Sequence, residues 1–198
     1  MMFTGITQQI GQIDHIEHRH DHTLRIGITT NQDYFSDSQV GASVMVDGIC
    51  LTITSFEPHH AFFNIMIPTF KATIVNHYQI GESVNLEKSI LATERFDGHF
   101  VLGHVDTTAR VIQKKRLEET VYFTFLVADT TLMSQIVPKG SIAISGVSLT
   151  VINTSKDTFQ IGLIPHTVTH THLGTLEIND LVNIETDILA KYLTKGDA

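Results

Sequence analysis

The stretch Gly48-Ile49-Cys50-Leu51-Thr52-Ile53 decides the fold, because the chain repeats it as Gly146-Val147-Ser148-Leu149-Thr150-Val151, 98 positions further on (146 minus 48). The same offset relates Val84-Asn85-Leu86-Glu87 to Val182-Asn183-Ile184-Glu185 (182 minus 84). Because the offset is constant, the two copies contain no net insertion between these anchors. The repeat predicts one duplicated unit of barrel size rather than an array of short repeats.

The two copies divide the 198-residue chain. We predict an N-terminal domain over residues 1–98, a C-terminal domain over residues 99–187 and a helical tail over residues 188–198. The copies differ at one chemically important position, where Cys50 in the first corresponds to Ser148 in the second. A duplicated binding site whose halves have taken different roles would show this kind of difference.

Composition narrows the class of protein. Apolar residues make up 42% of the chain, which is ordinary for a soluble protein. No run approaches the ~20 apolar residues that span a bilayer. The net charge of −8 argues against binding to nucleic acid or to an anionic membrane. The single cysteine excludes an intramolecular disulfide, and the start of the chain lacks a signal-peptide pattern, so we expect a cytoplasmic protein.

Short segments rich in Val, Ile, Thr and Phe, separated by Gly, Asn and Asp, predict an all-β fold. Six such segments in each unit leave many sheet edges, and closure of each sheet into a small barrel removes them. The predicted strands span residues 3–14, 22–29, 43–47, 49–56, 60–66 and 83–88, and then 101–112, 120–127, 141–145, 147–154, 158–164 and 181–186.

Helical periodicity is scarce and short. Residues 129–137 combine an N-capping aspartate with apolar residues at helical spacing. Residues 69–76 and 167–174 each have room for one or two helical turns, and residues 188–193 predict a short terminal helix. No low-complexity linker separates the two units, so we expect a tight junction near residues 92–100.

The repeated motif places small polar groups on one face of a strand. Successive side chains alternate between faces, so Cys50 and Thr52 share a face while Leu51 points to the other. Ser148-Leu149-Thr150 repeats this arrangement. Each unit then presents two small polar groups beside an apolar plug. Cys50 can also be interpreted as a small buried apolar residue.

Two histidines lie between glycines at the start of the second unit, in the stretch Gly98-His99-Phe100-Val101-Leu102-Gly103-His104. Glycine lets a backbone approach a flat ligand closely. At the 98-residue offset His104 corresponds to Ile6, so only one copy carries this ionisable side chain. The alternative to a functional histidine here is a core histidine bonded to a backbone carbonyl.

The remaining histidines favour surface positions over a metal site. Those in residues 15–22 sit among charged residues at a predicted hairpin tip, with no distant fourth ligand in the sequence. Residues 59–60 form another turn. His166, His170 and His172 have spacings of four and two, which fit no single face of a regular element. We therefore predict no metal site.

Further motifs complete a pattern that covers nearly the whole chain, and on this pattern the chain resembles the trimeric, alpha-type riboflavin synthase family. The motifs are Met2-Phe3-Thr4-Gly5-Ile6, Asp47 to Thr52, Gly98 to His104, Gly146 to Thr150, Leu163 to Thr167 and Val182 to Asp187.

The resemblance implies two tandem six-stranded antiparallel Greek-key barrels with short helices, each barrel binding one 6,7-dimethyl-8-ribityllumazine. One lumazine would give a four-carbon unit to the other, yielding riboflavin and 5-amino-6-ribitylamino-2,4-pyrimidinedione. The family uses no metal and no other cofactor. Its active site is composite, because the N-terminal barrel of one subunit faces the C-terminal barrel of its neighbour in a homotrimer. An association with lumazine synthase is a further expectation.

The resemblance also implies which residues bind substrate. The first barrel would supply Phe3, Gly5, Ile6, Thr7, Ser43, Cys50, Leu51, Thr52, Asn64, Ile65, Met66, Ile67, Pro68 and Thr69. The second would supply His99, Gly103, His104, Val105, Lys139, Ser148, Leu149, Thr150, Gly162, Leu163, Ile164, Pro165, His166 and Thr167.

Four residues carry implied catalytic roles. His104 would assist proton removal or activate a nucleophile. Ser148 and Cys50 would stabilise, or add transiently to, the ring of their respective lumazines. Asp187 would polarise a neighbour or hold ribityl hydroxyls. Phe3 would close the N-terminal pocket.

Two other functions compete with this enzyme. The first is a non-catalytic lumazine- or flavin-binding protein of the same ancestry, as in the lumazine proteins associated with luminescence. Such relatives tend to lose the Cys and His positions, whereas Cys50, His104 and Ser148 are all present here. The second is the flavin-binding module of an oxidoreductase, which predicts a nicotinamide-binding domain after the barrels.

Overall fold

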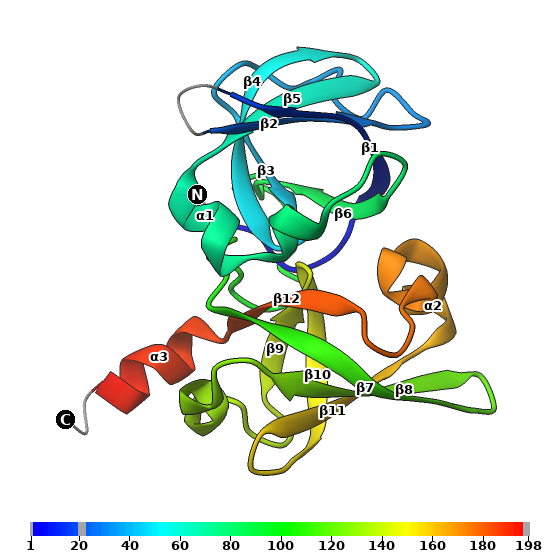
Figure 1. Cartoon of the computed structure of the whole chain (residues 1–198), viewed down its shortest axis with the longest axis vertical. Coiled ribbons are helices and arrows are strands. Elements are labelled where there is room, and N and C mark those ends of the chain that lie inside the picture. Colours follow the sequence, from blue (N-terminus) through cyan, green and yellow to red (C-terminus); the bar gives the residue numbers. More distant parts are fainter. Residues whose placement is uncertain (1, 20–22, 196–198) are drawn as a thin grey trace.

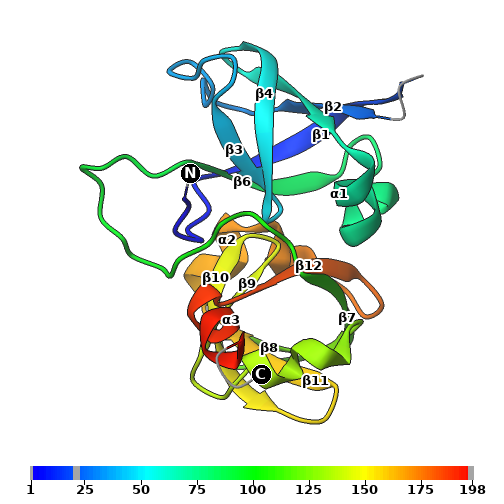
Figure 2. The ribbon, with the colours of Figure 1, turned by 90° about the vertical axis from the view of Figure 1, so that its left-hand side faces the viewer.

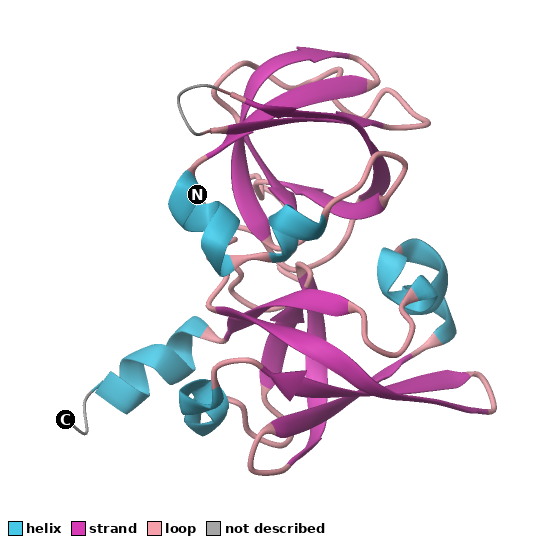
Figure 3. Ribbon diagram, viewed as in Figure 1, coloured by secondary structure: helices cyan, strands magenta, loops and turns pink. Residues whose placement is uncertain are grey.

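The computed structural model describes residues 2–19 and 23–195 and contains two closed barrels of six antiparallel strands, stacked one above the other (Figure 1). Strands dominate both barrels, and the helical segments lie at their margins (Figure 3). The first barrel comprises β1 Gln9–His18, β2 Leu24–Thr29, β3 Ser43–Val46, β4 Ile49–Glu57, β5 His60–Ile65 and β6 Ser83–Lys88. The second comprises β7 Thr107–Leu117, β8 Thr120–Val127, β9 Ser141–Ile144, β10 Val147–Thr154, β11 Thr158–Leu163 and β12 Leu181–Thr186.

Both barrels have the same strand order, which confirms the predicted Greek-key fold. The order is β1-β2-β5-β4-β3-β6 in the first and β10-β11-β8-β7-β12-β9 in the second. Pairing of β1 with β6 closes the first barrel, and pairing of β9 with β10 closes the second in the order written here. Each of these twelve strands therefore has a neighbour on both sides, which protects the sheet edges.

Each barrel encloses its own core. Ile26 and Phe63 are fully buried in the first, and Phe123 and Phe159 are buried in the second. The alternating exposure along β8 shows that every second side chain points inward. Burying one such side chain contributes about 1.5–3 kcal/mol, so the two cores account for much of the stability.

The helical segments follow the same duplication. They are α1 Ile67–Ala72 with the 3-10 turn Ile74–His77, α2 Pro165–His170 with the 3-10 turn His172–Thr175, and α3 Ile188–Lys195, which projects from the lower barrel in Figure 1. The helix predicted over residues 129–137 is a shorter 3-10 helix, Thr130–Gln135, because the backbone turns extended at Ile136. As predicted, Asp129 caps it by accepting a hydrogen bond from Thr131 N–H. None of the helices in the described part of the chain is long and apolar enough to cross a membrane.

The predicted strands at 3–14 and 101–112 begin later than expected. β1 starts at Gln9 and β7 at Thr107, and before them the chain forms only an isolated bridge between Phe3 and Val101. Gly5 (φ +79°) and Gly103 (φ +76°) take left-handed backbone conformations that interrupt an extended strand. The start predicted for the second strand, residue 22, lies outside the described residues.

The junction between the barrels is not tight. Residues 89–106 connect β6 to β7, and Figure 2 shows part of this connection swinging out from both barrels. Within this connection the rings of Phe96 and Phe100 pack against each other, with centroids 4.8 Å apart, so this stabilising contact is local. The absence of low-complexity sequence therefore did not indicate a short connection.

The barrels meet at the two hairpin turns of the repeated motif. Asp47 and Ser145 have positive φ values (46° and 42°), as do the glycines that follow them, which is the two-residue turn that suits a β-hairpin. A Cβ on Gly48 would lie 2.8 Å from the backbone nitrogen of Gly146, and the reverse substitution would meet the equivalent atom at 2.8 Å. Only glycine therefore permits this contact.

Two asparagines bond reciprocally across the same contact. Asn85 donates to the Ser145 carbonyl (3.0 Å), and Asn183 donates to the Asp47 carbonyl (2.8 Å). Their side-chain oxygens accept from backbone N–H groups of the opposite barrel, at His172 and Ile74 respectively (2.9 Å each). The repeated Val-Asn-x-Glu motif thus encodes a pseudo-twofold contact between the barrels.

Candidate functional site

The repeated motif occupies equivalent strands, β4 and β10, with the predicted alternation. Leu51 is buried in the first core, whereas Cys50 is half-buried and Thr52 is exposed. In β10, Ser148 is half-buried and Thr150 is exposed. The small polar groups therefore lie on the outer face of each barrel.

A glycine turn from each barrel contacts the repeated strand of the other. Gly103 carbonyl accepts a hydrogen bond from Cys50 N–H (2.8 Å), and Gly5 carbonyl accepts one from Ser148 N–H (2.7 Å). A Cβ on either glycine would come within 2.6 Å of the Cβ of Cys50 or Ser148. The sequence assigns Gly5 and Cys50 to one barrel and Gly103 and Ser148 to the other, and the structure adds that each glycine turn contacts the strand of the opposite barrel. An isolated antiparallel bridge between Phe3 and Val101 holds the two segments together where they cross.

Ser148 forms a close pair with His99. Its Oγ lies 2.7 Å from His99 Nδ1, and His99 N–H bonds to the Thr4 carbonyl (3.1 Å). Burial lowers the pKa of His99, although the nearby charge of Asp187 opposes that shift. A neutral imidazole with its proton on Nε2 accepts at Nδ1 from the Ser148 hydroxyl. His99 Nε2 is buried without a hydrogen-bond partner among the described residues. The imidazole of His99 can thus accept the proton of the Ser148 hydroxyl.

Cys50 has a different environment. Burial raises the pKa of its thiol, a hydrogen bond with Ser43 partly opposes this, and the charge of Glu185 raises the pKa further. The residue is therefore a thiol at neutral pH, suited to donating a hydrogen bond rather than to acting as a ready thiolate nucleophile.

His104 and Asp187 occupy accessible positions. The His104 side chain is exposed, while its backbone N–H is held by Glu185 Oε2 (3.0 Å). Asp187 follows β12 and caps α3 by accepting from Leu189 N–H (2.9 Å). The charge of Asp187 is felt by His99, which brings Ser148, His99 and Asp187 into one electrostatic neighbourhood.

Phe3 has a structural position. It is fully buried between the barrels, where it packs in a small cluster with Met45, Val101 and Ala143. A ring in that position holds the crossed segments together, and closure of the N-terminal pocket by Phe3 stays a prediction.

The other predicted binding residues differ in exposure. Ile6 (45% exposed), Met66 (65%), Ile67 (42%) and Ile164 (57%) expose apolar surface. Asn64, Pro68, Lys139, Pro165 and His166 are exposed, Thr7, Thr69, Val105, Leu149, Gly162 and Thr167 are half-buried, and Ser43, Ile65 and Leu163 are buried. Of the buried three, Ser43 also lines a cavity of about 290 Å³.

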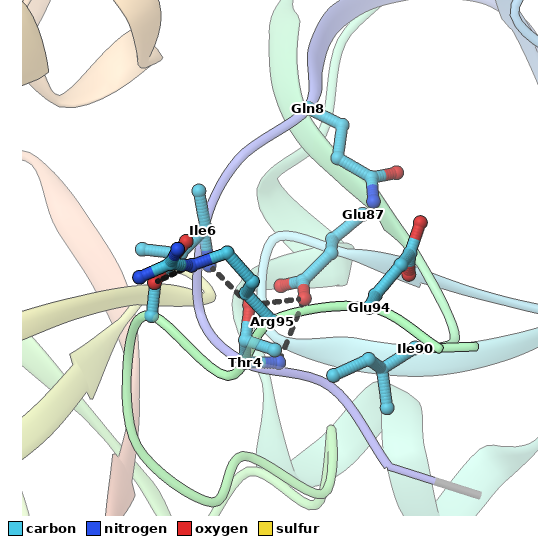
Figure 4. Close-up of a pocket in the computed structure, with 8 residues that line it drawn as sticks. Thr4, Ile6, Gln8, Glu87, Ile90, Glu94 and Arg95 are labelled. Carbon is cyan, nitrogen blue, oxygen red and sulfur yellow. Dashed lines mark hydrogen bonds and ion pairs between the residues drawn. The ribbon is translucent and has the colours of Figure 1, made fainter. Parts of the chain in front are cut away.

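A cavity of about 270 Å³ lies beside the Gly5 turn. Figure 4 shows Thr4, Ile6, Gln8, Glu87 and the connecting loop lining it. Among the described residues, no group of three or more His, Cys, Asp or Glu is placed to hold a metal ion. His166 and His170 stack with ring centroids 4.0 Å apart on α2. Residues 20–22 of the predicted hairpin tip, which include two of its histidines, lie outside the described residues.

Sequence reasoning missed two acidic residues that shape the site. Glu87 and Glu185 are buried (2% exposed each) and bind the backbone of the two glycine turns. The signal was the second repeat, Val84 to Glu87 and Val182 to Glu185, which we used only as evidence of duplication.

Comparison with known proteins agrees with this architecture. The family model described as "Lumazine binding domain" matches residues 4–89 and again residues 102–187. The riboflavin synthase of Bacillus subtilis is 40% identical over 97% of this chain and 88% of its own. That of Schizosaccharomyces pombe is 36% identical over 98% of this chain and 93% of its own.

Solved structures of LumP superpose closely on the chain. The complex with riboflavin has a TM-score of 0.85 at 28% identity, and the complex with 6,7-dimethyl-8-(1'-D-ribityl) lumazine has 0.83 at 27%. Both cover 93% of this chain and 99% of LumP. Fold and matched repeats thus define a tandem pair of lumazine-binding domains. With relatives of this identity over nearly its full length, the chain belongs to the riboflavin synthase family.

Proposed function

We propose that this chain catalyses the dismutation of two molecules of 6,7-dimethyl-8-ribityllumazine. One molecule gives up a four-carbon unit and becomes 5-amino-6-ribitylamino-2,4-pyrimidinedione, and the other receives it and becomes riboflavin. The atoms of two substrates equal those of the two products, so the reaction needs no external oxidant or reductant. The observation that carries the proposal is the match of both halves to a lumazine-binding domain in a chain 40% identical to a riboflavin synthase.

The reaction asks the protein for alignment and for a few proton transfers. The 7-methyl group of the lumazine is already acidic, because its carbanion delocalises into the ring. Holding two rings face to face can supply about 7–11 kcal/mol of the barrier. One positioned base adds about 10²–10⁴-fold. Two barrels with equivalent exposed strands provide two matched surfaces for two copies of one substrate.

We assign the proton chemistry of the second surface to Ser148 and His99. Their 2.7 Å contact and the lowered pKa of His99 support a hydroxyl that adds to, or bonds with, the lumazine ring while the imidazole takes its proton. The exposed His104 is free to reach a ligand on the first surface, beside Cys50 and Thr52. The thiol of Cys50 then acts as a hydrogen-bond donor to that ligand.

The complete site in this proposal lies between subunits of a homotrimer. The outer faces that carry Thr52 and Thr150 are exposed in the single chain. Leu189 (56% exposed), Tyr192 (72%) and Leu193 (75%) form an apolar face on α3 that a neighbouring subunit would cover. Light scattering tests this assembly. Cytoplasmic location and association with lumazine synthase, testable by fractionation and co-purification, remain parts of the same proposal.

The test uses purified protein and the lumazine alone. Appearance of riboflavin absorption and fluorescence is the expected result, and turnover should fall about 10²–10⁴-fold in Ser148→Ala. Tight binding without product would instead favour a non-catalytic lumazine or flavin carrier, the function suggested by the LumP complexes. The presence of Cys50, His104 and Ser148 favours the enzyme.

A further inference from the structure

Two buried glutamates occupy equivalent places in the two barrels. Glu87 lies in β6 and Glu185 in β12, 98 positions apart (185 minus 87), and each is 2% exposed. A carboxylate is costly to bury unless it is hydrogen-bonded. Each of these carboxylates has its partners in one short segment of backbone.

Glu185 binds three consecutive N–H groups. Its Oε1 accepts from Leu102 (2.7 Å), and its Oε2 accepts from Gly103 (2.9 Å) and His104 (3.0 Å). The turn that carries His104 is therefore fixed to β12 by one carboxylate.

Glu87 holds the equivalent turn in the first barrel. Its Oε1 accepts from both the N–H (2.7 Å) and the hydroxyl (2.8 Å) of Thr4, and its Oε2 accepts from Gly5 N–H (3.0 Å). Figure 4 shows this carboxylate pointing at Thr4, with the bonds between them dashed.

Each glycine turn that a glutamate binds also bonds, through its backbone carbonyl, to the opposite barrel. The Gly103 carbonyl bonds to Cys50 N–H (2.8 Å), whereas the Gly5 carbonyl bonds to Ser148 N–H (2.7 Å). The Thr4 carbonyl also accepts from His99 N–H (3.1 Å). The electrostatics agree, since the charge of Glu185 contributes to the raised pKa of Cys50 in the other barrel.

We propose that Glu87 and Glu185 are positioning residues that act across the contact between the barrels. Glu185 in the second barrel places Cys50 of the first barrel and the His104 turn, and Glu87 in the first barrel places Ser148 and His99. Their role in turnover rests on the proposed function, whereas their effect on the opposite strand does not.

A carboxylate is needed because it offers only acceptors. Two oxygens face three donors in each case, and charge-assisted bonds are stronger than neutral ones. A glutamine would replace one acceptor by an NH₂ donor that opposes a backbone N–H. Glu185→Gln should therefore loosen the Leu102–His104 turn while keeping the volume of the side chain.

Hydrogen–deuterium exchange with peptide-level mass spectrometry tests the crossed action. Glu185→Gln should raise exchange in the peptide spanning residues 49–53 by about tenfold or more and leave residues 147–151 unchanged. Glu87→Gln should do the reverse. Glu82→Gln, which removes a surface carboxylate that caps a turn of the first barrel, is the matched control and should change neither peptide.

The outcome that overturns the proposal is exchange that rises only within the mutated residue's own barrel, or equally in both. Should Glu87→Gln fail to fold, Thr4→Val removes one of its partners without touching the first barrel's sheet, and it should still raise exchange at 147–151 alone. If the two glutamates act as positioning residues in the reaction, each glutamine variant should show a lower kcat together with its crossed exchange pattern. If the glutamine variants show the crossed exchange pattern but the wild-type protein forms no riboflavin, the positioning role is upheld and the proposed reaction is rejected.

Discussion

His172 Nε2 in the second barrel lies 2.9 Å from Asp47 Oδ1 in the first, and both side chains are almost completely buried. Asp47 also accepts from Tyr78 hydroxyl (3.0 Å) and Asn85 N–H (2.8 Å). The equivalent positions on the other side of the pseudo-twofold axis are Ser145, Ile74 and Leu176. The contact between the barrels is thus charged on one side and largely apolar on the other.

This asymmetry makes the stability of the protein depend on pH. Burial lowers the pKa of His172, but the charge of the adjacent Asp47 outweighs it and the net pKa is raised. A group with a raised folded-state pKa stabilises fully below its unfolded value, about 6.5 for histidine, and loses that contribution as the pH rises through the folded value. The free energy of unfolding should therefore fall as the pH rises above about 6.5 in the wild type and fall less in His172→Ile. Urea titrations at several pH values measure it, and identical slopes would refute the assignment.

The apolar side supplies the template for a second test. Asp47→Ser alone strands a buried histidine and should destabilise by about 3–5 kcal/mol. Adding His172→Ile and Tyr78→Leu copies the opposite side of the contact, and this triple variant should recover most of the loss. Denaturant midpoints compare the three proteins. A triple variant no more stable than Asp47→Ser would show that the charged side has no apolar substitute.

The crossed glycine turns predict a difference between two alanine variants. A Cβ added at Gly41 (φ +89°) would meet no atom within 4 Å, whereas one added at Gly103 (φ +76°) would lie 2.6 Å from the Cβ of Cys50. Both Gly41→Ala and Gly103→Ala carry left-handed strain of about 1–2 kcal/mol. Only Gly103→Ala also pushes the turn from Cys50, so its melting temperature should drop further. Equal losses would mean that the turn has room to shift.

Under the proposed function, the lowered pKa of His99 should set the acid limb of the pH–rate profile. Burial keeps the imidazole neutral below its ordinary value of 6.5, so kcat should remain on its plateau there and fall only at lower pH. His99→Gln should lower kcat by about 10²–10⁴-fold and abolish that limb. A pH–rate profile measures both. Retention of the same acid limb in the variant would assign it to another group.

The raised pKa of Cys50 predicts a sluggish thiol. Because burial disfavours the thiolate, alkylation of this single cysteine near neutral pH should be slower than that of a free cysteine and should accelerate with rising pH. Iodoacetamide labelling followed by intact-mass measurement checks the rate. Labelling as fast as that of a free thiol would contradict the buried environment.

Local pattern was enough to predict most of this fold. The alternation around Leu51 and the turn residues between segments identified every strand core, and the constant offset assigned the same topology to both halves. The segments before Gln9 and Thr107 were predicted as strand because their composition favours it. Each of these segments is bound by a buried carboxylate far along the chain, and local periodicity gives no information about such a partner.

The candidate site stays a prediction, and the structure adds which of its residues contact one another. The sequence singled out Cys50, Ser148 and the glycine turns, because small polar groups and positive-φ residues recur at one offset. It grouped each turn with the strand of its own unit, since sequence distance was the only guide. The pairing of Ser148 with His99, 49 positions apart, depends on how the barrels dock, which single-strand reasoning does not reach.

The reciprocal contacts also explain why the two copies contain no net insertion relative to each other. Gly5 must reach Ser148 while Gly103 reaches Cys50, and the turns at Gly48 and Gly146 touch with no space to spare. An inserted residue in either half would put its turn out of step with a strand that belongs to the other half. The contacts of each copy therefore constrain the length of the other copy. Insertions are expected in segments without such contacts, such as the outlying connection between β6 and β7.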